Sequence, residues 1–171
     1  MNSFDAAIIG GGVIGGSIAF ELAAEKLRVV LLERQQPGRE ASWAAAGMLS
    51  PGPDSPDALP LVPLSKASLE LYPEFVSALE NSSGKSAAFT REGTLEIFPS
   101  AHGESERDAM IAEFRRLGLA IEPISLDAAR RMERSIGPAA RAAAWLPYEA
   151  TVDPRMLTEA VMAAARSRGV E

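Results

Sequence analysis

The sequence has no cysteine, and it has a single histidine, His102, among 171 residues. The missing cysteine excludes disulfides, thiol catalysis, cysteine-ligated metals and cofactor attachment to a cysteine within this chain. One histidine cannot build a multi-histidine metal site, so we expect no metal centre. His102 lies in a loop-like Pro-Ser-Ala-His-Gly stretch, and we expect a solvated loop residue there rather than a catalytic base.

Basic residues are in the minority. The chain carries 17 lysines and arginines against 23 aspartates and glutamates, which gives a formal net charge of −6. This balance argues against a nucleic-acid partner and against an anionic membrane surface. The sequence shows no basic leader and no long uncharged apolar run, so we expect no secretory signal and no membrane span. The cytoplasm is therefore the default expectation for its location.

Glycine is concentrated between two apolar runs, residues 6–9 and 29–32. Gly10, Gly12 and Gly15 fit the G-x-G-x-x-G spacing of a dinucleotide-binding turn. In such a turn the first glycine allows a tight bend after the strand. The second lets a pyrophosphate approach the backbone, and the third lets the helix pack closely on the strands. The helix N-terminus then offers unpaired N–H groups to the phosphates.

An acidic residue completes this unit. Glu33 follows the second apolar run, where a carboxylate can accept hydrogen bonds from ribose hydroxyls. We therefore predict strands near residues 5–9 and 28–33 joined by a helix over residues 13–26, which is a parallel βαβ unit. The alternative is a glycine-rich turn that only packs a strand against a helix. That alternative is disfavoured because each ordered glycine costs about 0.5–1 kcal/mol relative to alanine.

The rest of the chain has a different composition and pattern of apolar residues. Residues 34–63 are rich in proline and predict mostly irregular structure. An apolar stripe over residues 64–79 predicts a helix with a kink at Pro73, or two helices that meet there. Beyond it we expect a hairpin over residues 88–98, a helix at 105–117, a strand at 121–124, a helix at 126–133 capped by Ser125, and a strand at 142–146.

Asp153 and Pro154 predict the start of a last helix, which runs to about residue 168. Residues 170–171 resemble the opening of another strand. Because a doubly wound sheet needs more than two strands, we interpret the chain as the N-terminal part of a longer enzyme. The alternative is a small complete protein whose short strands close the sheet differently.

The loop after Glu33 indicates which family of dinucleotide-binding proteins this chain resembles. Small residues at 44–47 are followed by Met48, Leu49 and a proline. Together with the glycine turn, the Leu-Tyr-Pro at residues 71–73 and residues 148–154, this loop resembles the FAD-dependent D-amino-acid oxidase superfamily. The resemblance is greatest to its glycine oxidase branch, which is associated with thiamine biosynthesis. It implies an α/β fold: the N-terminal part of a Rossmann-like FAD-binding domain, with an inserted α+β portion of the substrate domain.

The resemblance also implies domain bounds and cofactor contacts. The FAD-binding domain would comprise residues 1–85 and 149–171, and the substrate domain residues 86–148. Besides the turn glycines, the residues that would hold FAD are, from pyrophosphate to isoalloxazine, Val13 and Ile14 through their backbone, Glu33 and Arg34 at the adenosine ribose, Ala41 and Ser42 at the middle, and Ala46, Gly47 and Met48 at the isoalloxazine.

The small-residue loop makes physical sense for a flavin. A flat, wide ring system needs backbone nearby without bulky side chains, and residues 44–47 permit that approach. Met48 can pack on the ring as an adaptable apolar neighbour. The bland alternative is an alanine-rich buried turn or the start of a helix.

The activity implied is the oxidation of glycine or another small amino acid to its imine, with electrons passed to oxygen, as in the EC 1.4.3 class. In glycine oxidases the imine feeds thiazole synthesis. The partners would be a small amino acid and oxygen, and homo-oligomerisation of the full-length enzyme is left open. The arginine that binds the substrate lies in the family's C-terminal half, so no catalytic residue is assigned. Arg91 and Arg141 are better interpreted as surface residues. We expect the chain alone to be inactive and to bind FAD weakly or not at all.

Three other interpretations stay open. The first is another FAD-dependent amine, sarcosine or D-amino-acid oxidase or dehydrogenase. The second is an NAD(P)-binding dehydrogenase domain. In that domain Arg34 would pair with a 2′-phosphate, but the neighbouring Glu33 disfavours this because its carboxylate would repel the phosphate. The third is a non-enzymatic module with a decayed nucleotide fold, which the intact glycine spacing argues against.

Overall fold

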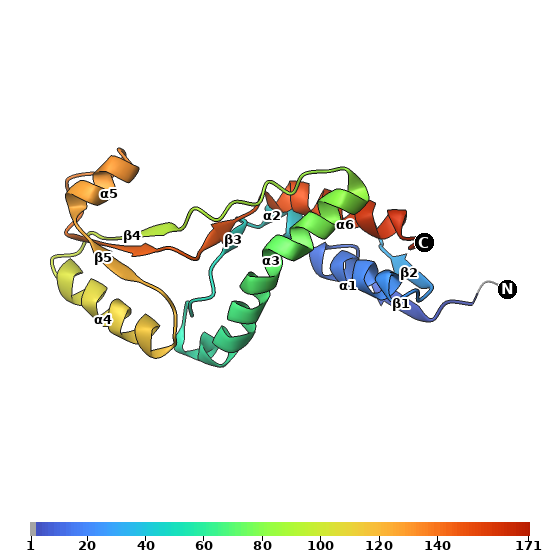
Figure 1. Ribbon diagram of the computed structural model, residues 1–171, viewed down its shortest axis with the longest axis horizontal. Helices are drawn as coiled ribbons and strands as arrows, with labels where there is room; N and C mark the ends of the chain where they lie inside the picture. The colour runs from blue at the N-terminus through green and yellow to red at the C-terminus, as the bar shows by residue number, and fades with distance from the viewer. Residues whose placement is uncertain (1–2) are drawn as a thin grey trace. The chain divides into compact units, whose positions relative to one another are not determined.

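The structure is a computed structural model that describes residues 3–171. The chain forms two compact units (Figure 1). Unit 1 contains the residues up to Met48 together with Glu70–Thr90 and Thr151–Glu171. Unit 2 contains Leu49–Leu69 and Arg91–Ala150. The chain therefore enters unit 2 twice, and each time it returns to unit 1, the second time for its last helix.

Unit 1 opens with the predicted βαβ unit. It consists of β1 (Ala6–Ile9), α1 (Val13–Ala24) and β2 (Val29–Leu32). The two strands are parallel, with Ala6 opposite Val29 and Ile9 opposite Leu32. The prediction is confirmed to within one or two residues at each end.

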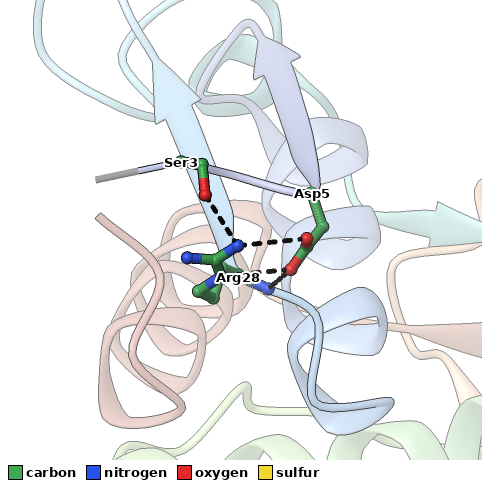
Figure 2. Close-up of polar contacts among 3 residues, drawn as sticks. All are labelled: Ser3, Asp5 and Arg28. Carbon is green, nitrogen blue, oxygen red and sulfur yellow. Dashed lines mark hydrogen bonds and ion pairs between the residues drawn. The ribbon is translucent and has the colours of Figure 1, made fainter. Parts of the chain in front are cut away.

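Polar contacts fix the start of this sheet (Figure 2). The backbone N–H of Arg28 donates to Asp5 Oδ2 over 2.8 Å, and the backbone N–H of Asp5 donates to the Arg28 carbonyl over 2.8 Å. The Arg28 guanidinium also reaches Asp5 and the hydroxyl of Ser3, the latter over 2.9 Å. The hydrogen bond from the Arg28 backbone is the main reason that the pKa of Asp5 is lowered. These contacts set the register before the first residue of β1.

The last helix, α6 (Pro154–Ser167), packs on α1 in unit 1 (Figure 1). Asp153 caps it as predicted, because its Oδ1 accepts the N–H groups of Arg155 and Met156 over 2.9 and 3.1 Å. The chain then reaches β2. The Glu171 N–H donates to the Val29 carbonyl over 3.1 Å, and its carbonyl accepts from the Leu31 N–H over 2.7 Å. This alternation is typical of parallel pairing, so the backbone of Glu171 is hydrogen-bonded along the edge of β2.

Helix α3 (Val62–Ser83) passes Pro73 as a single helix, so the two-helix alternative is wrong. Aromatic packing in unit 1 accounts for its continuity beyond the proline. Phe75 contacts Phe20 of α1 edge-on at 6.5 Å between ring centroids, and Tyr72 stacks on Phe89 at 5.7 Å. These contacts hold the turns on which Pro73 removes a backbone donor.

Unit 2 contains a three-stranded antiparallel sheet in the order β4 (Thr94–Phe98), β6 (Ala142–Leu146), β5 (Glu122–Ile124). Helix α4 (Gly103–Arg116) packs on this sheet, and α5 (Leu126–Met132) begins at the predicted cap, Ser125. The core of unit 2 comprises Val62, Phe98, Ile111, Phe114, Leu119, Ile121, Ala142, Ala144 and Leu146.

Four further elements of the chain are short. They are α2 (Ala41–Ala44), β3 (Met48–Leu49), the 3-10 helix η1 (Pro56–Leu61) and β7 (Ala150–Thr151), and β3 pairs with β7.

The hairpin predicted for residues 88–98 is wrong. β4 pairs with β6 instead, and Thr90 forms an isolated bridge with Thr151. The backbone explains the difference, because Ala88 has a φ of +50° and cannot continue an extended strand. The alternating side chains of β4 therefore find their partners in a strand far along the sequence.

Candidate functional site

The glycine turn has the geometry that its spacing predicts. Gly10 has a φ of +107°, and its N–H donates to the Leu32 carbonyl over 2.9 Å, which ties the turn to the neighbouring strand. A Cβ on Gly15 would lie 2.0 Å from the Gly10 carbonyl oxygen and 3.3 Å from Ile8 Cγ2. Helix α1 therefore approaches β1 as closely as a bare backbone allows. A Cβ on Gly12 would lie 3.0 Å from Ser42 Oγ.

Glu33 points back to this turn. Its Oε2 accepts the N–H of Gly11 over 2.8 Å, and its Oε1 accepts the N–H of Gln35 over 2.9 Å. These two backbone hydrogen bonds, that of Gly11 first, lower the pKa of the Glu33 carboxyl. Each carboxylate oxygen has two lone pairs, so each keeps one for a further donor. The arrangement suits a pair of ribose hydroxyls.

Ser42 joins the turn to the loop that follows. Its Oγ accepts the N–H of Val13, the first residue of α1, over 3.0 Å. The hydroxyl proton of Ser42 is therefore left to donate to another group, such as a phosphate oxygen. The following first-turn N–H groups, those of Ile14 and Gly15, have no acceptor within the helix. Three donors thus meet at the start of α1, beside the partial positive charge of the helix terminus.

Residues 44–47 form a ledge of small side chains on the surface of unit 1. Ala44, Ala45 and Ala46 are exposed, and Met48 is 64% exposed. Gly47 has a φ of +78°, and a Cβ there would lie 2.0 Å from the Val152 carbonyl oxygen. The Gly47 carbonyl accepts the Val152 N–H over 2.9 Å, which anchors the ledge. The short helix α2 ends at Ala44, the first residue of the ledge, and the exposure of the three alanines rules out the alternative of a buried alanine-rich turn.

The guanidinium of Arg34 has a partner in the loop after β2. It pairs with Glu40, with 2.6 Å between Nη2 and Oε1. This hydrogen bond and the charge of Glu40 raise the pKa of Arg34. The side chain is therefore engaged by its own loop, and the charge of Glu33 adds to the rise in the pKa of Arg34.

Sequence reasoning missed two supports of this site. Gly11 is buried, and a Cβ there would lie 3.1 Å from Glu33 Cβ, so this glycine is what lets Glu33 reach the turn. The signal was present as an extra glycine inside the motif. The second support is Val152, whose backbone holds Gly47 across about a hundred residues of sequence. No local pattern in the sequence marks that contact.

The other candidates do not join this site. In unit 2 the Arg91 guanidinium donates to the Leu69 carbonyl over 2.6 Å, which is a structural role. Arg141 is exposed, and His102 is an exposed residue just before α4. Within residues 3–171, no group of three or more acidic or histidine side chains is placed to hold a metal ion. Nor does any helix in that range have the length and apolar character needed to cross a membrane.

All twelve residues predicted to hold the cofactor lie in unit 1, from Gly10 to Met48. A family model described as FAD dependent oxidoreductase, DAO, matches residues 5–171. The chain belongs to this family. Membership accounts for the glycine turn, the acidic residue and the open ledge together, because the family depends on FAD. The hydroxyl of Ser42 and the free N–H groups of Ile14 and Gly15 suit a diphosphate, and Glu33 suits a ribose, so the residues present fit this cofactor.

Individual relatives of the chain carry more specific names than the family does. The chain is 34% identical over 170 residues to a glycine oxidase of Geobacillus kaustophilus, with 97% of this chain and 44% of that protein covered. It is 32% identical to a bifunctional protein ThiO/ThiG of Synechocystis, with 98% of this chain and 24% of that protein covered. The crystal structure of the Geobacillus glycine oxidase superposes with a TM-score of 0.91 and 31% identity, over 98% of this chain and 45% of that one. The chain thus spans less than half the length of these relatives.

Proposed function

We propose that this chain is the FAD-holding N-terminal part of an enzyme that oxidises glycine or another small amino acid to its imine. The observation that carries the proposal is the link between three backbone segments. Glu33 accepts from the glycine turn, and Ser42 accepts from the first residue of α1. These contacts align the turn, the acidic residue and the loop that leads to the ledge.

The roles proposed for the residues follow from what each can donate or accept. The backbone of Val13 and Ile14 would approach the diphosphate, with the N–H of Ile14 and the hydroxyl of Ser42 as free donors, while Glu33 would accept from the ribose. Ala41 would lie beside the middle of the cofactor, and Ala46, Gly47 and Met48 beside the isoalloxazine. When bound there, FAD supplies the two-electron acceptor that amine oxidation requires. The ledge leaves that acceptor's surroundings free of bulky side chains.

The substrate and the electron acceptor are proposed from the relatives. Proteins named glycine oxidase and ThiO/ThiG support glycine, or a similarly small amino acid such as sarcosine, as the substrate. The ThiO/ThiG name supports a place in thiamine biosynthesis. Molecular oxygen is proposed as the acceptor, with hydrogen peroxide as its product. An NAD(P) enzyme is less well supported because Arg34, the residue that would meet a 2′-phosphate, is paired with Glu40.

We also propose which residues belong to the FAD-binding domain and which to the substrate domain. Residues 1–85 and 149–171 would serve FAD, and residues 86–148 would belong to the substrate domain. Because relatives extend well beyond the matched region, the 171 residues alone are expected to lack turnover and to hold FAD weakly.

The test is to express the full reading frame to which these residues belong, and to measure peroxide release with glycine, sarcosine and D-alanine. The proposal predicts a yellow protein with flavin absorbance that releases peroxide with glycine. A flavin-containing protein that oxidises none of the three amines would overturn the substrate assignment. Peroxide release from glycine by residues 1–171 alone would overturn the assignment of this chain as an incomplete catalyst.

A further inference from the structure

Unit 1 contains a second feature that the cofactor residues do not use. A groove of about 290 Å³ runs between the loop after β2 and one face of α6. Helices α2 and α6 pack against each other at this place (Figure 1). The lining of the groove shares no residue with the set expected to hold FAD.

Close packing forms the groove. Gly38 is buried with a φ of +75°, and a Cβ on it would lie 2.4 Å from Thr158 Cγ2 on α6. The loop can therefore lie directly on the helix. This contact brings Arg39, the next residue, to the same groove as Arg155 on the first turn of α6.

The charge of the groove is opposite to that of the chain. Its lining contains four basic residues and one acidic residue: Arg39, Lys85, Arg155, Arg166 and Glu159. Lys85 and Glu159 pair over 3.5 Å. In the part of the chain that the structure describes, the three arginines have no carboxylate partner. Three unpaired guanidiniums in one groove of a protein with net charge −6 create a local positive potential that attracts anions.

Two of these guanidiniums are held in place by Trp43. The Arg39 Cζ lies 3.6 Å from the centroid of a Trp43 ring, and the Arg155 Cζ lies 4.9 Å from it. Arg155 Nε also donates to the Trp43 carbonyl over 3.4 Å. These contacts orient the side chains and leave most of their N–H groups available, so a ligand would not have to order them.

We propose that this groove binds a small anion with two neighbouring phosphate or carboxylate groups, of which a diphosphate is the simplest. Planar guanidiniums donate in pairs to such oxygens, and three of them match an anion with more than one acidic group. The volume is at the lower end of ligand pockets, which limits the occupant to a compact molecule.

The test is calorimetric titration of inorganic pyrophosphate into the 171-residue chain at constant ionic strength. The proposal predicts saturable binding that weakens at least tenfold in the double variant Arg39→Gln/Arg166→Gln. Binding should be unchanged in the control variant Arg131→Gln, which alters an exposed arginine of α5 in unit 2. Orthophosphate should bind more weakly than pyrophosphate.

Two further measurements separate this groove from the glycine turn and from loss of folding. Glu159→Gln removes the one carboxylate of the lining, so the affinity for pyrophosphate should rise several-fold. The full reading frame with FAD bound should bind pyrophosphate with the same affinity, because FAD would occupy the turn and not the groove. Absence of saturable binding at millimolar pyrophosphate, an unchanged affinity in Glu159→Gln, or a loss of binding in the FAD-loaded protein would each overturn the proposal.

Discussion

Replacement of Gly15 by alanine should destabilise the protein, although alanine favours helices. The added Cβ would lie 2.0 Å from the Gly10 carbonyl oxygen and 3.2 Å from its carbon. The start of α1 would have to move by about 1 Å to restore an ordinary contact. Because both partners are backbone, no side chain can rotate to relieve the clash.

The magnitude follows from two opposing effects. Overpacking of this kind costs about 1–3 kcal/mol, and a backbone contact so short belongs at the upper end. Exchange of glycine for alanine inside a helix returns about 1 kcal/mol. The net loss is about 2 kcal/mol, which corresponds to a fall in Tm of roughly 4–8 °C for a chain of this size.

The assay is thermal unfolding followed by circular dichroism, with Gly137→Ala as the matched control. A Cβ on Gly137 meets nothing within 4 Å, and its φ lies outside the left-handed region. The control should be neutral or gain about 0.4–1 kcal/mol because alanine restricts the unfolded chain. If Gly15→Ala melts at or above the wild-type temperature, the close approach of α1 to β1 is wrong.

Further predictions concern other residues. Asp153→Ala removes the acceptor of two N–H groups on the first turn of α6, so Tm should fall by roughly 2–4 °C, a cost of about 1 kcal/mol; an unchanged melting curve would contradict the cap. Burial, and then the charge of Glu149, raise the pKa of Glu96, so the folded state favours the proton and loses stability as pH rises through that raised pKa. Glu96→Gln should therefore melt higher than wild type at pH 7, and the difference should shrink as the pH falls through that raised pKa; a difference independent of pH would contradict it. Gly47→Ala in the full reading frame should lose bound flavin absorbance because its Cβ has no room beside the Val152 carbonyl; retained absorbance would remove the ledge from the site.

The sequence was sufficient to predict those elements whose structure depends on residues close together in the chain. The βαβ unit, the caps at Ser125 and Asp153, and the start of the last helix rest on glycine placement, apolar runs and capping side chains. Each of these is a local interaction with a recognisable residue type. The glycine turn and Glu33 belong to this class because strand, helix and acidic residue follow one another within a single unit.

Long-range pairing could not be predicted in this way. The partner of β4 is β6, some fifty residues further on, and nothing in residues 88–98 distinguishes that pairing from a hairpin. The anchoring of Gly47 by Val152 is hidden for the same reason. Continuity of α3 through Pro73 depends on aromatic contacts made in the folded state. In each case tertiary packing decided between alternatives that were locally equivalent.

The most direct test of the central claim is the dissociation constant for FAD of the full reading frame, compared between wild type and Glu33→Gln. In the variant, one carboxylate oxygen becomes an NH₂ group, which cannot accept the hydrogen bonds that this oxygen receives. The remaining amide oxygen is uncharged, so its hydrogen bonds to the ribose would be weaker. Such bonds contribute about 1.5–3 kcal/mol, so FAD should bind roughly 10- to 150-fold more weakly. Glu21→Gln on the exposed face of α1 should bind FAD like wild type. Equal affinities for wild type and Glu33→Gln would contradict the assignment of this turn as the seat of the cofactor.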